Sequence, residues 1–60
     1  MDAEEFARHL ERVSRLAAGL HRSKSDDLIL TWLSQEMERD DLKGWQRGQI
    51  FNAATSFIRI

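Results

Sequence analysis

Histidine is the residue type that most often changes charge near neutral pH, so acid–base or metal chemistry in this chain would begin with its two histidines. His9 stands one helical turn after Glu5, close enough for an imidazole–carboxylate pair or for two ligands to one cation. A zinc site needs three or four ligands, and the helical spacing supplies no others. We therefore expect a solvated pair at His9 and a helix-capping role for His21.

Two pairs of adjacent acids, Asp26 with Asp27 and Asp40 with Asp41, resemble the paired carboxylates of acid–base catalysis. Neighbouring residues on a helix point about 100° apart, however, and both pairs lie where a helix would begin or a turn would form. The chain has no cysteine, which removes thiolate metal sites and cysteine nucleophiles. We expect no catalytic, cofactor-binding or metal-binding residues, and no enzymatic activity.

Helices are the elements that must position these side chains. The 60 residues include no proline and only three glycines, and no segment sustains the alternation of apolar and polar residues typical of a strand. The sequence predicts an all-α fold with one domain over residues 1–60, built from helices at about 3–20, 25–39 and 44–59.

Local signals set the predicted helix boundaries. Asp2 is placed to cap the first helix, and Gly19 with the polar residues after it predicts the end of that helix. Ser23 or Ser25 would cap the second helix, and Asp40, Asp41 and Gly44 suit a turn or the start of the third helix.

Apolar residues exceed what one short chain is expected to bury. The first helix has apolar residues at alternating steps of three and four, as in a coiled-coil seam, and the last helix is apolar on two sides. A domain of this size buries only about 60% of the surface that its unfolded chain exposes. We therefore predict a homo-oligomeric helical bundle, most simply a dimer, with an interface formed by Phe6, Leu10, Val13, Leu20, Ile50, Phe51, Ala54, Phe57 and Ile58.

Charge is distributed unevenly along the chain. The formal net charge is −1, but residues 25–43 contain six acidic and two basic side chains. We interpret the chain as a small regulatory or adaptor protein that binds a target protein, possible targets including a basic DNA-binding protein that it would inhibit. The predicted partner-binding residues are Glu36, Glu38, Asp40, Asp41 and Trp45.

Nucleic-acid binding is the alternative hypothesis. Arginines on the first helix could contact phosphates, and polar residues early in the third helix could read base edges in a major groove. The overall acidity and the poor fit of residues 39–43 to a helix-turn-helix turn disfavour this reading. The candidate residues are Arg8, Arg12, Arg15, Arg47, Gln49 and Asn52.

We expect neither a secretory leader nor a membrane-spanning segment. Asp2, Glu4 and Glu5 stand where a secretory leader would carry positive charge and then an apolar run. No stretch approaches the roughly 20 apolar residues that cross a bilayer. We expect a cytoplasmic protein that does not enter the membrane.

Overall fold

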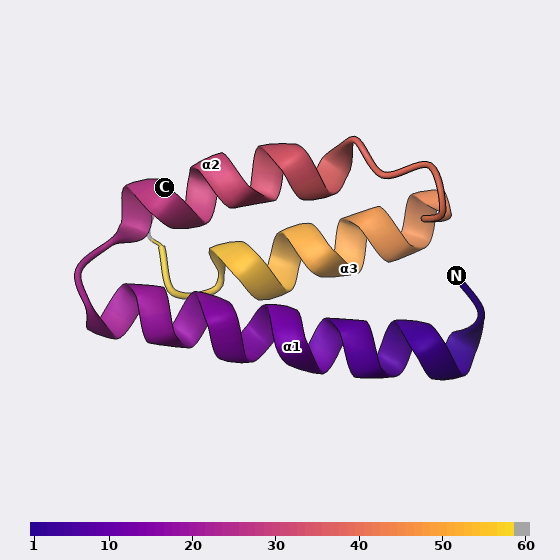
Figure 1. The fold of residues 1–60 in the computed structure, drawn as a ribbon, viewed down its shortest axis with the longest axis horizontal. Coiled ribbons are helices and arrows are strands. Elements are labelled where there is room, and N and C mark those ends of the chain that lie inside the picture. The colour runs from indigo at the N-terminus through magenta and orange to yellow at the C-terminus, as the bar shows by residue number, and fades with distance from the viewer. Residues whose placement is uncertain (59–60) are drawn as a thin grey trace.

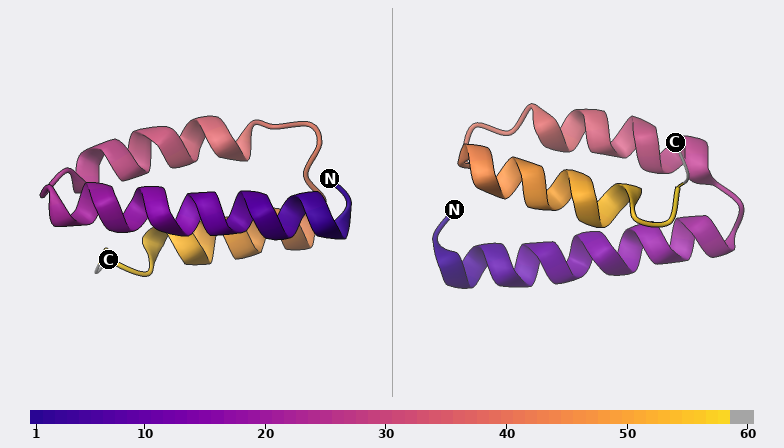
Figure 2. Two further views of the ribbon diagram at one scale, coloured as in Figure 1. Left: turned by 60° about the horizontal axis from the view of Figure 1, so that its bottom comes forward. Right: turned by 180° about the vertical axis from the view of Figure 1, so that it is seen from behind.

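The fold is a bundle of three helices, seen in a computed structural model that describes residues 1–58 (Figure 1). Helix α1 spans Ala3–Arg22, α2 spans Asp26–Met37 and α3 spans Gly44–Thr55. The chain runs along α1, returns along α2 and turns again, so that α3 is parallel to α1. Figure 2 shows that each helix lies beside the other two: α3 lies between α2 and α1 in the right view, and α1 lies in front of α3 in the left view. The all-α, three-helix prediction is confirmed.

Helix α1 begins as the sequence predicts. The Asp2 side chain accepts a hydrogen bond from the backbone N–H of Glu5 at 2.8 Å, which satisfies one of the free donors of the first turn. The apolar heptad positions form the inward face of α1, and Phe6, Val13 and Ala17 on this face are buried.

The end of α1 differs from the prediction, because the helix continues through Gly19 to Arg22. Lys24 instead adopts the left-handed conformation, with φ of 58°. The Ser25 N–H donates to the Leu20 carbonyl at 2.8 Å and the Lys24 N–H donates to the His21 carbonyl at 3.0 Å. These two bonds define a Schellman cap in which lysine holds the position usually given to glycine.

Helix α2 follows after three connecting residues, 23–25, and the Ser25 side chain makes no capping bond. It ends at Met37, two residues before the predicted end. Its inward face is formed by Ile29, Leu33 and Glu36.

Helix α3 begins at the predicted residue and ends at Thr55, four residues early; residue 59 lies outside the described part of the chain. Its inward side chains, Gln46, Ile50 and Ala54, are spaced four residues apart. The Gln46 side chain accepts from the backbone N–H of Lys43 at 2.9 Å, which organises the first turn.

One core joins the three helices, and α1 packs most extensively against α3. Leu42, from the connection between α2 and α3, is also buried in it. The buried apolar residues are Phe6, Val13, Ala17, Ile29, Leu33, Leu42, Ile50 and Ala54. Within residues 1–58, no helix combines the length and the apolar character required to cross a membrane.

Candidate functional site

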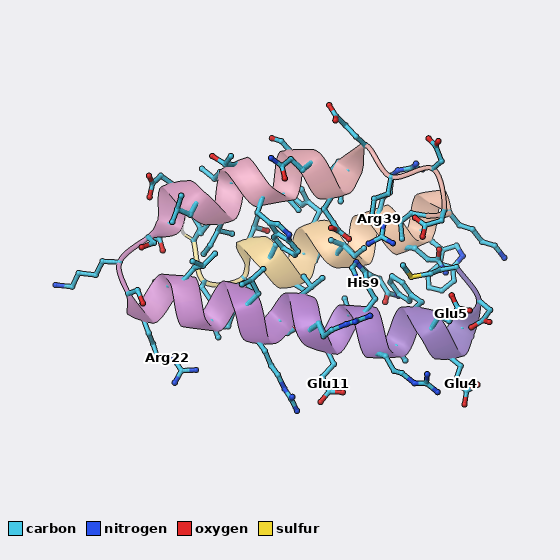
Figure 3. All side chains as sticks on the ribbon, in the orientation of Figure 1. Glu4, Glu5, His9, Glu11, Arg22 and Arg39 are labelled. Carbon is cyan, nitrogen blue, oxygen red and sulfur yellow. The ribbon has the colours of Figure 1, made fainter. Side chains whose placement is uncertain are left out.

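A polar cluster links α1 to the end of α2 inside the bundle. His9 Nε2 and Glu36 Oε1 share a hydrogen bond, and both residues are less than 9% exposed. The Arg39 guanidinium donates to the same Glu36 oxygen at 3.3 Å. In Figure 3, His9 and Arg39 point toward each other across the groove between α1 and α2, whereas Glu4, Glu11 and Arg22 point away from the bundle.

Arg39 also binds both carboxylate oxygens of Asp41, while its Nη1 bonds to Glu36. Nε donates to Oδ1 at 3.0 Å and Nη2 donates to Oδ2 at 2.8 Å. These hydrogen bonds raise the pKa of Arg39 and lower the pKa of Asp41. Arg39 therefore bridges the buried Glu36 and the exposed Asp41, and both carboxylates have a cationic partner.

An open pocket of about 460 Å³ lies in the groove between α1 and α2, and the cluster residues His9, Glu36 and Arg39 form part of its lining. Its apolar lining includes Val13, Leu16 and Trp32, and the Arg12 side chain adds a guanidinium. The lining contains no hydroxyl or thiol that could act as a nucleophile, and His9 and Glu36 are bonded to each other. The pocket can hold an apolar group beside an acidic one.

The connection between α2 and α3 is held by backbone contacts that the sequence does not reveal. Arg47 of α3 donates from Nε to the Met37 carbonyl at 3.3 Å and from Nη2 to the Arg39 carbonyl. The buried Gln46 donates from Nε2 to the Met1 carbonyl at 2.9 Å. The positions of Gln46 and Arg47 in the sequence do not indicate that their side chains bond to backbone carbonyls outside α3. These roles therefore follow only from the three-dimensional structure.

The two histidines have partners other than those expected. His9 pairs with Glu36 and not with Glu5, because it lies on the inward face of α1. His21 Nδ1 lies 3.0 Å from Asp26 Oδ1 at the start of α2, and the His21 ring stacks on Phe57 after the end of α3. The His21 side chain therefore contacts these two segments and does not cap backbone carbonyls of α1.

The residues predicted for an oligomer interface divide into two groups. Phe6, Val13, Ile50 and Ala54 fill the core of the single chain, so a second copy cannot reach them in this fold. The remaining five keep accessible surface: Phe51 and Phe57 are exposed, and Leu10, Leu20 and Ile58 are partly buried.

The residues predicted to bind a target protein do not form one acidic surface. Glu36 is buried against His9, and Asp41 is paired with Arg39. Glu38, Asp40 and Trp45 remain exposed. Trp45 lies against Phe6, with ring centroids 5.2 Å apart in an edge-on arrangement, so one side of its ring faces the bundle.

The candidate nucleic-acid residues are similarly divided. Arg8 lies 3.8 Å from Glu4, and Arg15 forms an ion pair with Glu11, so each has an acidic neighbour one turn away. Arg12 lines the pocket, and Arg47 is bonded to backbone carbonyls. Gln49 and Asn52 are exposed on α3.

The described residues 1–58 contain no group of three or more acidic or histidine side chains arranged to hold a metal ion. The chain matches no known protein family, no curated protein and no solved structure, so its geometry is the basis for the functional interpretation.

Proposed function

We propose that this chain is a small non-enzymatic regulatory or adaptor protein that acts by binding proteins, including a second copy of itself. The observation that carries the proposal is its exposed apolar surface. Six large apolar side chains are between 38% and 54% exposed: Leu16, Leu28, Leu30, Trp45, Phe51 and Phe57.

Single exposed apolar residues are ordinary on a protein surface, but the aromatic content makes this set unusual. The chain has three phenylalanines and two tryptophans, and three of these five residues are exposed. Aromatic side chains are enriched at protein interfaces, where each removes a large apolar area from water. A surface of this kind is therefore best explained by contact with other proteins.

The groove between α1 and α2 supports target binding. Leu16 and Trp32 provide apolar walls, and none of residues 1–58 forms an ion pair with Arg12 at its rim. A partner helix with large apolar residues and one acid would suit this groove.

Inhibition of a basic DNA-binding protein is a more specific form of the proposal. Its support is now limited to Glu38 and Asp40, which are exposed, because the other two acids of the predicted patch have partners within the chain. Capture of such a factor by the wild type but not by the Glu38→Gln, Asp40→Asn variant would support this form; equal capture would remove it.

Nucleic-acid binding is less well supported, because two of its three α1 arginines are next to glutamates and Arg47 is turned toward the chain. A gel shift with random duplex at low salt tests it directly. A shifted band with the wild type that is lost in the Arg12→Ala variant would support nucleic-acid binding.

Sedimentation velocity over a dilution series in the micromolar range tests the proposal itself. We expect the sedimentation coefficient to rise with concentration as copies associate. A coefficient that stays at the monomer value, together with failure to retain any protein from a cell extract, would contradict the proposal.

A further inference from the structure

The solvent-facing side of α3 has a composition unlike that of the other helices. We define the outer face of α3 as Gly44, Trp45, Gly48, Gln49 and Asn52, all of which are exposed. Helical geometry places this face opposite the buried residues of α3. The exposed Phe51 adjoins it.

No charged side chain lies on this face. Arg47 is the one charged residue between Gly44 and Thr55, and its guanidinium bonds to the carbonyls of Met37 and Arg39. The outer surface of α1, in contrast, carries Glu4, Arg8, Glu11 and Arg15. Depletion of charge with retention of aromatic residues is the composition found at the core of protein interfaces.

We infer that two copies of this chain associate through the outer face of α3, with the two helices crossing near Gly48. The inference rests on the proposed function and specifies its first partner and its surface.

The absence of charge favours a second copy as the occupant. In a two-fold dimer the same surface lies on both sides of the contact, so any charged group near the axis approaches its own equivalent. An uncharged face avoids that repulsion, and Gln49 and Asn52 can each donate and accept hydrogen bonds with their equivalents.

Gly48 supplies supporting geometry. Glycine within a helix costs about 1 kcal/mol relative to alanine, yet a Cβ built at Gly48 would meet no atom of the chain within 4 Å. The single chain thus offers no packing reason for this glycine, and the same holds for Gly19 and Gly44; Gly48 differs in lying in the middle of the uncharged outer face of α3. A second helix would offer a packing reason, because the distance between packed helices depends on the side chains at their crossing point.

The exposed surface of α2 is the main rival. It presents Leu28 and Leu30, but Asp26 and Asp27 occupy the first turn beside them. A two-fold contact near this turn would bring the two Asp27 side chains toward each other, beside the Asp26 side chains that pair with His21. The α3 face carries no such penalty.

Size limits the expected affinity. A standard interface covers about 800 Å² of each partner, about a fifth of the 4276 Å² surface of this chain. A contact centred on the 12 residues of α3 would be smaller, in the size range of weak and transient interfaces.

A charge substitution tests the surface. The Gln49→Glu variant places like charges on both sides of the contact, and we expect its dimer dissociation constant to rise at least about tenfold, with partial recovery at high salt. Gln35→Glu makes the same chemical change on exposed α2 and serves as the matched control. Sedimentation equilibrium measures both, and circular dichroism confirms that both remain helical.

A glycine substitution tests the crossing point. Gly48→Ala and Gly19→Ala both add a methyl group to an exposed helical position where a Cβ meets no atom of the chain within 4 Å. Both are expected to raise the thermal midpoint of the monomer, measured at dilutions below the association range. Gly48→Ala alone is expected to weaken dimerisation.

The outcomes separate this inference from the proposed function. If the wild type dimerises and Gln35→Glu weakens the dimer while Gln49→Glu does not, α2 is the interface and the inference is overturned. If neither variant changes a wild-type dimer, the inference also fails while protein binding stands. A wild type that stays monomeric at millimolar concentration overturns the inference and removes self-association from the proposed function.

Discussion

His9 of α1 and Glu36 of α2 share a hydrogen bond between two side chains that are 8% and 7% exposed. They are separated by 27 residues in the sequence, so the bond connects two helices, which also meet through apolar contacts and through the exposed His21–Asp26 pair. Arg39 completes the hydrogen bonding of Glu36 from the solvent side. The cluster holds α2 against α1 at the part of the groove where the pocket lies.

Removal of one member of this pair is expected to destabilise the bundle strongly. His9→Ala leaves the buried Glu36 side chain with only Arg39 as a partner, and loss of one buried hydrogen-bond partner costs about 1 to 3 kcal/mol. Urea unfolding followed by circular dichroism gives the change in free energy.

Two further variants make that test specific. His21→Ala removes the His21–Asp26 pair, whose side chains are both 45% exposed, and should cost less than about 1 kcal/mol. The His9→Leu, Glu36→Leu double variant should recover much of the lost stability, because it buries no unpaired charge. Equal losses for His9→Ala and His21→Ala would show that the buried bond contributes little.

Lys24→Gly is expected to stabilise the protein. Lys24 has φ of 58°, a conformation that costs a non-glycine residue about 1 kcal/mol and that glycine adopts freely. Thermal unfolding should show a higher midpoint for this variant. Ser23→Gly is the control, because Ser23 has φ of −82° and gains nothing from glycine; a gain in both variants would point to a different cause.

Asp2 is expected to make stability depend on acidic pH. The hydrogen bond from the Glu5 N–H lowers the pKa of Asp2 below its ordinary value of 3.8. A lowered folded pKa means that this contribution is fully present above the ordinary value and is lost as the pH falls through the folded value. Asp2→Asn retains a capping oxygen but does not titrate, so its melting temperature should fall less steeply with acidification; an unchanged slope would contradict the assignment.

Arg47 is expected to hold the connection between α2 and α3. Arg47→Met removes its hydrogen bonds to the carbonyls of Met37 and Arg39 and should cost about 1 to 3 kcal/mol. Backbone amides of residues 38–43 should then exchange faster with solvent. Arg22→Met, on the exposed end of α1, is the control, and equally fast exchange in both variants would show that the carbonyl contacts do not hold this segment.

The helices could be predicted because their signals are local. Asp2 caps α1 through a residue three positions away, and the spacing of Phe6, Val13 and Ala17 follows the helical repeat. The end of α1 differs from the prediction because the helix continues past Gly19 and Lys24 adopts the left-handed conformation that glycine usually holds. The backbone hydrogen bonds from Lys24 and Ser25 to the last turn of α1 close the helix there without a glycine.

The candidate site could be predicted only in part. Exposed Phe51 and Phe57 follow from the excess of apolar residues, which is a property of the sequence. The pairing of His9 with Glu36 and the inward turn of Arg47 depend on which helices meet and at what register. An acidic run such as residues 36–41 has the same composition whether its members face solvent or a buried partner.

Contact between two α3 helices is the central claim, and paramagnetic relaxation tests it most directly. The chain has no cysteine, so Gln49→Cys gives one attachment site for a nitroxide on an unlabelled copy, mixed with a ¹⁵N-labelled wild-type copy. We predict that the amides of residues 44–52 of the ¹⁵N copy broaden, while those on the outer surface of α1 stay sharp. Broadening confined to α1 or α2, or no broadening at concentrations where sedimentation detects a dimer, would contradict the claim.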